Sequence, residues 1–138
     1  MKARRFVDTN ILLYSISRNP GEVAKRDRAA AFLEADDLAL SAQVLQEFYV
    51  QTTRADRTDA LPHDIAAGLI HAWTRFPVQE VSPGIVMAAL EIRAMLGFSY
   101  WDSAIIAAAQ VLGCRELLSE DVNHGQRIDD VTIVNPFR

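Results

Sequence analysis

The sequence predicts an α/β protein, a three-layer α/β/α sandwich built around a mainly parallel central sheet. Two observations lead to this fold class. Short apolar runs alternate with longer stretches of helical periodicity along the chain, which is the pattern of βαβ units. Polar residues that carry chemistry follow directly after some of the short runs, as expected at the carboxyl edge of a parallel sheet. We therefore expect one sheet with helices on both of its faces.

The first half of the chain is predicted to hold two strands and four helices. Residues 5–7 and 38–40 are short runs dominated by apolar residues, which favours strands. Ser41 is a good N-cap for the third helix, and Pro62 opens the fourth. Apolar residues recur at helical spacing in the remaining segments. The four predicted helices span residues 10–17, 22–35, 42–54 and 62–75.

The second half is predicted to hold three strands and two helices. Ser82 followed by Pro83 supplies a cap and a proline in the first turn of one helix. Ser99 caps the other helix, and Gly113 ends it. The predicted strands span residues 78–81, 116–118 and 131–134, and the predicted helices span residues 83–96 and 100–112.

Composition bounds the class of protein. The chain has 138 residues, half of them hydrophobic and 23% charged, and it shows no repeat or Gly/Ser linker, so residues 1–138 are predicted to form a single domain. The single cysteine, Cys114, cannot form an intramolecular disulfide, which suits a reducing compartment. No stretch approaches the roughly 18 apolar residues of a membrane span. We expect a cytoplasmic protein with no membrane association.

Four carboxylates are predicted to lie near one edge of the sheet. Asp8 directly follows the first strand, and Asp121 lies just after the fourth. Glu47 lies near the start of the helix after the second strand, and Asp102 lies in the first turn of the helix that Ser99 caps. Because the carboxyl ends of parallel strands meet at one edge, these four side chains are candidates for a shared site.

Each of these carboxylates also has a purely structural explanation. Asp8 could cap the helix that follows it, and Asp102 stands three residues after Ser99, which is the spacing of a capping box. Glu47 could be a solvated helix residue, and Asp121 an ordinary turn residue. We prefer a common function because four separate explanations would otherwise have to hold together and still place four acids on one edge by chance.

Metal binding explains why carboxylates would gather in one place. Clustered anions raise one another's pKa, so such a cluster is costly without a cation. Mg²⁺ and Mn²⁺ prefer oxygen ligands, and a bound ion can acidify a water molecule, orient a phosphate and stabilise the leaving oxygen. The net charge of −4 argues against general attraction of nucleic acid, but setting the four acids aside leaves equal numbers of acidic and basic residues. The pattern therefore favours a metal-dependent nuclease.

Four segments resemble the motifs of PIN-domain proteins, and they occur in the order found in that family. The segments are FVDTNILLY at residues 6–14, SAQVLQEF at 41–48, SYWDSAIIAAA at 99–109 and LLSEDVNHG at 117–125. Together they are spread over residues 6–125, which is most of the length of the chain. The resemblance implies a PIN-like α/β/α fold and Mg²⁺- or Mn²⁺-dependent hydrolysis of RNA phosphodiester bonds.

The resemblance also implies a biological role and a set of site residues. Single-domain PIN proteins of this size are most often VapC-type toxins of toxin–antitoxin pairs, usually homodimers that a small VapB-like antitoxin inhibits. Carried over by position, the catalytic and metal-binding acids are Asp8, Glu47, Asp102 and Asp121. Thr9, Asn10 and Ser119 become supporting residues, with Ser119 standing where the family often has Thr. Glu120 is a rival for the fourth acidic position; we favour Asp121 because it aligns with the family's Asp.

Three other functions stay open at this point. A PIN nuclease with a housekeeping role in RNA processing or repair would carry the same acids. A non-enzymatic α/β binding module would use them only as helix caps. A haloacid-dehalogenase-type phosphatase is disfavoured because Asp8 is followed by Thr9 and Asn10 rather than by the Asp-x-Asp pattern. A zinc site is disfavoured because no Cys/His pair has ligand spacing.

Overall fold

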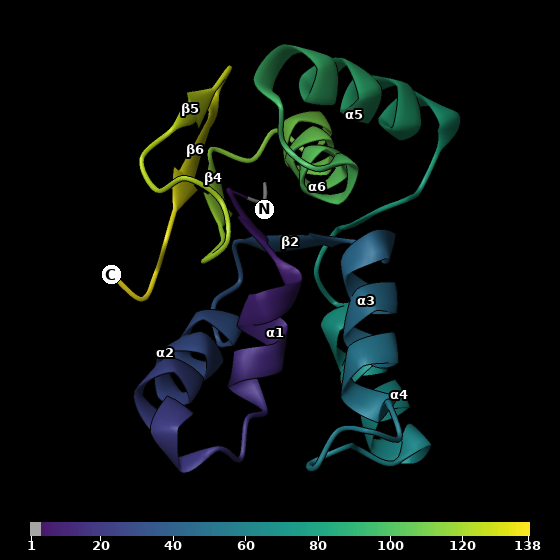
Figure 1. Cartoon of the computed structure of the whole chain (residues 1–138), viewed down its shortest axis with the longest axis vertical. Coiled ribbons are helices and arrows are strands. Elements are labelled where there is room, and N and C mark those ends of the chain that lie inside the picture. Colours follow the sequence, from purple (N-terminus) through teal and green to yellow (C-terminus); the bar gives the residue numbers. More distant parts are fainter. Residues whose placement is uncertain (1–3) are drawn as a thin grey trace.

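A six-stranded sheet forms the centre of the protein in the computed structural model, which describes residues 4–138 (Figure 1). The strand order is β3-β2-β1-β4-β6-β5, and every neighbouring pair is parallel except β5 with β6. The strands are β1 (Arg5–Val7), β2 (Leu38–Ser41), β3 (Val78–Gln79), β4 (Glu116–Leu118), β5 (Arg127–Ile128) and β6 (Val131–Val134). β1 lies between β2 and β4, so the carboxyl ends of these three strands share one edge.

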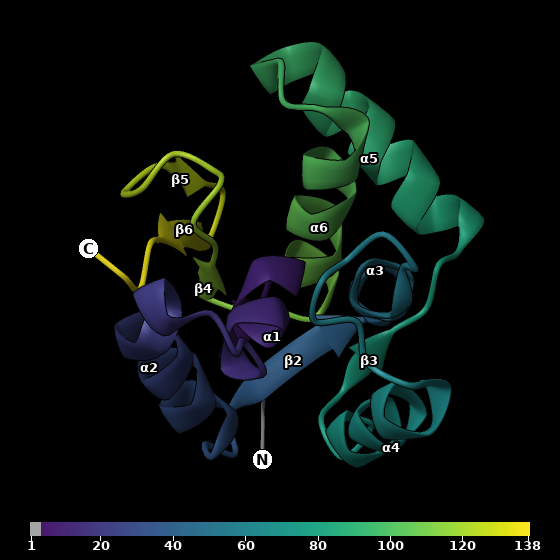
Figure 2. The ribbon, with the colours of Figure 1, turned by 60° about the horizontal axis from the view of Figure 1, so that its bottom comes forward.

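Helices cover both faces of this sheet and complete the predicted three layers. Figure 1 shows α5 and α6 above β2, with α1 to α4 below it, and Figure 2 shows β2 between α2 and α4 in a second view. The fold class predicted from the sequence is therefore confirmed. The helices are α1 (Thr9–Ser15), α2 (Val23–Leu33), α3 (Ala42–Thr53), α4 (His63–Trp73), α5 (Pro83–Leu96) and α6 (Tyr100–Val111), with a 3₁₀ turn η1 (Pro20–Glu22) before α2.

The core lies on both sides of the sheet. All four residues of β2 are buried, as expected for a strand that is covered on both faces. The α6 segment 103–109 is buried throughout, and its small residues let α5 pack closely on it. On the other side Phe48 of α3 packs edge-on against Trp73 of α4, with ring centroids 4.8 Å apart.

Apart from shifts of one or two residues at the ends of other elements, the structure departs from the predicted elements at three places. The first helix ends at Ser15 rather than residue 17, and beyond its end the Ser17 hydroxyl donates to Glu22 at 2.6 Å. β3 is limited to the two residues that pair with β2. β5 was not predicted: it has only two residues and turns back through Asp129, whose φ of 52° lies in the left-handed region. Within residues 4–138 no helix is both long and apolar enough to cross a membrane.

Candidate active site

Asp8 stands at the carboxyl end of β1, in the middle of the shared edge. Its backbone amide donates to the carbonyl of Leu118 at 3.0 Å, which extends the pairing of β1 with β4. Its side chain is 5% exposed and is held at both oxygens: Oδ1 accepts from the amide of Thr9 and Oδ2 from the hydroxyl of Ser119, each at 2.6 Å. Asp8 therefore does cap α1, and Ser119, the residue directly after β4, holds the other oxygen of the same carboxylate.

The environment of Asp8 disfavours its charged form. Burial raises the pKa of Asp8 from 3.8 to about 6, the hydrogen bonds from Ser119 and Thr9 oppose this shift, and the nearby charges of Asp121 and Asp102 add to it. At neutral pH the carboxylate is thus ionised at a free-energy cost. A cation in its vicinity would relieve that cost.

Asp102 and Asp121 approach Asp8 from two other elements. Asp102 is half-buried in the first turn of α6, where its amide donates to Ser99 Oγ at 3.1 Å. Burial raises the pKa of Asp102, a hydrogen bond with Ser99 opposes the shift, and the charge of Asp121 adds to it. Asp121 is exposed. Its backbone amide donates to Ser119 Oγ at 3.2 Å, and its carboxylate accepts from the side-chain amide of Asn10. Three of the four predicted acids are therefore close enough to influence one another's charge.

Glu47 belongs to the same edge through an indirect link. It is half-buried on α3, and its Oε1 accepts from the side-chain amide of Gln43 at 2.8 Å. The same amide donates to the carbonyl of Trp101 at 3.2 Å, directly before Asp102. Gln43 thus ties Glu47 to the first turn of α6. Glu47 is not among the charges that shift the pKa of Asp8 or Asp102, so it lies at the margin of the three aspartates.

Glu120, the rival for the fourth position, is directed elsewhere. Its Oε1 accepts from the hydroxyl of Tyr14 and its Oε2 from the ammonium of Lys25, each at 2.5 Å. Partial burial would raise the pKa of Glu120, but these hydrogen bonds and the Lys25 charge outweigh it and the pKa lies below its ordinary value. Glu120 is thus engaged with α1 and α2, whereas the charge of Asp121 acts on Asp8 and Asp102.

The donor chemistry of this edge suits a hard divalent cation, although the ligands are not preassembled. Within residues 4–138 no group of three or more His, Cys, Asp or Glu side chains is arranged to hold a metal ion as it stands. The three aspartates nevertheless offer only oxygen donors, and two of them have a raised pKa. The buried hydroxyl of Thr9, next to Asp8, has no hydrogen-bond partner in the part of the chain that the structure describes. These residues therefore fit Mg²⁺ or Mn²⁺ by donor type.

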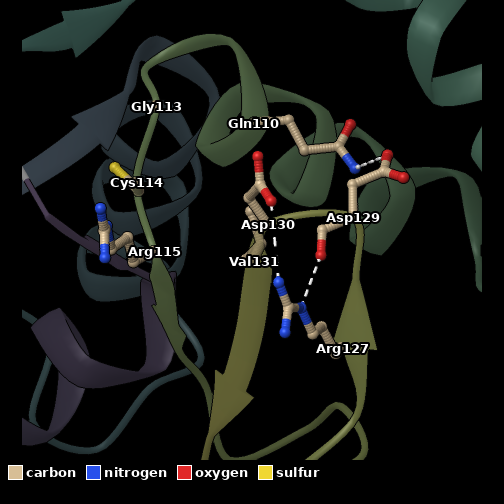
Figure 3. Close-up of a pocket in the computed structure, with 8 residues that line it drawn as sticks. All are labelled: Gln110, Gly113, Cys114, Arg115, Arg127, Asp129, Asp130 and Val131. Atoms are coloured by element: carbon tan, nitrogen blue, oxygen red, sulfur yellow. Dashed lines mark hydrogen bonds and ion pairs between the residues drawn. The ribbon is translucent and has the colours of Figure 1, made fainter.

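A cavity of about 500 Å³ lies at the opposite edge of the sheet, near the starts of β4 and β6 (Figure 3). Its charged groups are largely matched within it: Arg127 faces Asp130 at 3.8 Å, and Gln110 donates to Asp129 at 3.1 Å. None of the predicted site acids lines this cavity. The candidate site is therefore the open carboxyl edge, not this hollow.

The PIN-domain sequence profile matches residues 5–129. This chain belongs to the PIN-domain family. Members of the family are nucleases, which agrees with acids gathered at the edge of the sheet. A comparison with curated proteins gives no significant match.

Solved structures share the PIN fold of this chain. A toxin–antitoxin complex from Klebsiella pneumoniae matches with a TM-score of 0.70 and 22% identity, covering 96% of this chain and 97% of that one. FitAcB from Neisseria gonorrhoeae matches with a TM-score of 0.71 and 15% identity, over 96% and 98%. VapC20 from Mycobacterium tuberculosis, a toxin that cleaves the sarcin–ricin loop, matches with a TM-score of 0.67 and 19% identity, over 85% and 91%. At these identities the likeness concerns the fold.

Two contacts of this PIN-domain site were not predicted from the sequence. Gln43 stands four residues before Glu47 on one helix, so the i,i+4 spacing could have revealed their contact. Lys25 lies 95 residues from Glu120, and no local signal in the chain connects them.

Proposed function

We propose that this PIN-domain protein is a Mg²⁺- or Mn²⁺-dependent endoribonuclease that acts as the toxin of a toxin–antitoxin pair, with Asp8, Glu47, Asp102 and Asp121 as its metal-binding and catalytic acids. The observation that carries the proposal is that three aspartates, Asp8, Asp102 and Asp121, lie close enough at the carboxyl edge of a PIN fold for the charge of Asp121 to raise the pKa of the other two. Similar folds in VapC20, which cleaves RNA, and in toxin–antitoxin complexes support the biological role.

The residues of this chain have distinct tasks in such a reaction. A divalent ion, when bound, would acidify a water molecule and neutralise charge on the phosphate. Asp8 is oriented for this by the Thr9 amide and the Ser119 hydroxyl, which leave its carboxylate little freedom to rotate. Asn10 orients Asp121 in the same way. Because the pKa of Asp8 is about 6, metal binding and cleavage should increase as the pH rises through that value.

The surface supports the proposal of protein partners. Large apolar side chains stand exposed on α5 and at the start of α6, including Met87, Leu90, Met95 and Trp101. Their placement suits a homodimer and the docking of a small VapB-like antitoxin. Light scattering that gives a monomer at micromolar concentration would contradict the dimer.

RNA cleavage by the purified protein tests the catalytic part of this proposal. With Mn²⁺ we expect endonucleolytic cuts that chelation abolishes, and a loss of about 100-fold or more in both Asp8→Ala and Asp102→Asn, as for groups that act in the transition state. Asp130→Asn is the matched control, because Asp130 is 97% exposed and far from this edge. Full activity in both site variants, or activity without divalent ions, would overturn the mechanism.

The toxin role needs a cellular test. Induced expression should arrest growth, and co-expression of a cognate antitoxin should restore it. Sequencing of RNA ends after brief induction would identify the cleaved RNA. Normal growth during expression of protein that is active in vitro would favour a housekeeping nuclease instead.

A further inference from the structure

Lys25 is held beside the acidic edge by three other side chains. We name these four residues the Lys25 cluster: Tyr14, Lys25, Glu120 and Phe137. The Lys25 ammonium donates to Glu120 at 2.5 Å and to the Tyr14 hydroxyl at 3.4 Å. It also lies 4.9 Å and 5.5 Å from the ring centroids of Tyr14 and Phe137, within the range of cation–π attraction. The two rings meet edge-on at 5.1 Å. The ammonium is thus fixed by a carboxylate, a hydroxyl and two aromatic faces.

The helix α2 anchors this cluster at two points. Lys25 reaches the loop after β4, and Arg28, one turn later on α2, donates to the carbonyl of Pro136. The second contact holds the C-terminal segment that carries Phe137. The helix α2 therefore brings Lys25 to the loop after β4 and also holds the segment that carries one of its aromatic partners.

Adjacent acids of the loop after β4 have different hydrogen-bond partners. Glu120 turns toward α1 and α2, where Tyr14 and Lys25 engage both of its oxygens. Asp121 turns toward Asn10, and its charge acts on Asp8. Glu120 contributes no such charge to Asp8. To join the aspartates, Glu120 would have to lose both of its hydrogen bonds.

We propose that Lys25 is a positioning residue that holds Glu120 out of the acidic site, so that Asp121 alone represents this loop among the metal ligands. The inference rests on the proposed metal-dependent function. If Lys25 did not bind it, Glu120 would be free to compete with Asp121 for the ion. It would also add a negative charge to a place where carboxylates already repel one another.

Metal affinity and a rescue experiment test this role. Lys25→Met keeps an aliphatic side chain on the two rings but removes the charge. We expect the Mn²⁺ affinity, measured by calorimetry, to rise by about three- to tenfold, because the Lys25 ammonium is lost and the Glu120 carboxylate is released. The turnover number should fall by about fivefold or more, because the ligand set is altered. In Lys25→Met/Glu120→Gln both quantities should return to within about twofold of the wild type, because no freed charge remains.

Arg26→Met is the matched control. It removes one positive charge from the same helix, but within residues 4–138 the ion pair and hydrogen bonds of the Arg26 side chain go to its neighbour Asp27 and not to Glu120. We expect Mn²⁺ affinity and turnover close to those of the wild type. A double variant no better than Lys25→Met, or an equal effect of Arg26→Met, would overturn the inference, because either result means that Lys25 acts only through fold or overall charge.

A crystal structure of metal-free Lys25→Met separates this inference from the proposed function. We expect the Glu120 carboxylate to rotate away from Tyr14, because the Tyr14 hydroxyl alone remains where two donors held it. If the wild type neither binds Mn²⁺ nor cleaves RNA, the proposed function fails while this rotation still decides the position of Glu120. A Glu120 carboxylate that stays on Tyr14 in the variant refutes the positioning role.

Discussion

Replacing Asp8 by asparagine is expected to stabilise the metal-free protein at neutral pH. In the fold the pKa of Asp8 is about 6, above its ordinary value of 3.8, chiefly because the carboxyl is buried. The fold therefore favours the protonated form, and the stability that this form contributes is lost as the pH rises from about 4 through 6. A shift of about two pKa units corresponds to about 3 kcal/mol.

Asparagine avoids this loss because it carries no charge. Its side-chain oxygen can still accept from the Thr9 amide, so the cap of α1 is retained. We expect Asp8→Asn to exceed the wild type by up to about 3 kcal/mol at pH 8 and to match it near pH 4. Urea unfolding with a chelator present, repeated across this pH range, measures the difference. Added Mn²⁺ should narrow it, because only the wild type gains a full set of ligands.

Asp130→Asn is the control for this measurement, since Asp130 is 97% exposed and should change stability by less than about 0.5 kcal/mol at either pH. The reasoning is refuted if Asp8→Asn is less stable than the wild type at pH 8. A difference between the two proteins that does not change with pH would also refute it.

Three further substitutions probe the site and the core. Ser119→Ala removes the hydroxyl that donates to Asp8 and should lower metal-free stability by about 1–3 kcal/mol, with a larger loss at pH 8 than at pH 5 in urea unfolding, because the hydrogen bond favours the charged form. Phe48→Ala should cost about 3–5 kcal/mol in thermal unfolding, since Phe48 is fully buried against Trp73; an unchanged Tm would contradict that packing. Gly97→Ala should lower the free energy of unfolding by about 1 kcal/mol. The cost comes from the backbone, because φ is 78°, and not from a clash, because no atom lies within 4 Å of the added methyl group; a gain in Tm would show that this strain is absent.

The architecture could be predicted from the sequence because the signals for its elements are local. Apolar runs set β1, β2 and β4, and the serine caps at Ser41 and Ser82 each accept the backbone hydrogen bond that their position implies. β5 could not be found in this way. Its two residues are too few to show alternation, and its turn places Asp129, not a glycine, in the left-handed region.

The approach of Asp8, Asp102 and Asp121 to one another could be predicted from the sequence, but their detailed contacts could not. The prediction comes from several acids placed after strands or at helix starts, because the carboxyl ends of parallel strands share one edge. The hydrogen bond from Ser119 to Asp8 joins residues 111 positions apart, so only the register of β1 with β4 creates it. The choice between Glu120 and Asp121 depends on where α2 places Lys25, which is a matter of tertiary packing.

The two tryptophans of this chain occupy environments so different that they form separate optical reporters. Trp73 is 5% exposed and packs on Phe48, so its fluorescence should follow the integrity of the core. Trp101 is 63% exposed, and its carbonyl receives the amide that also holds Glu47. In a Trp73→Phe variant the remaining emission would come from the residue beside Asp102 alone. Ligands arriving at the acidic edge could then be followed in real time without an added label.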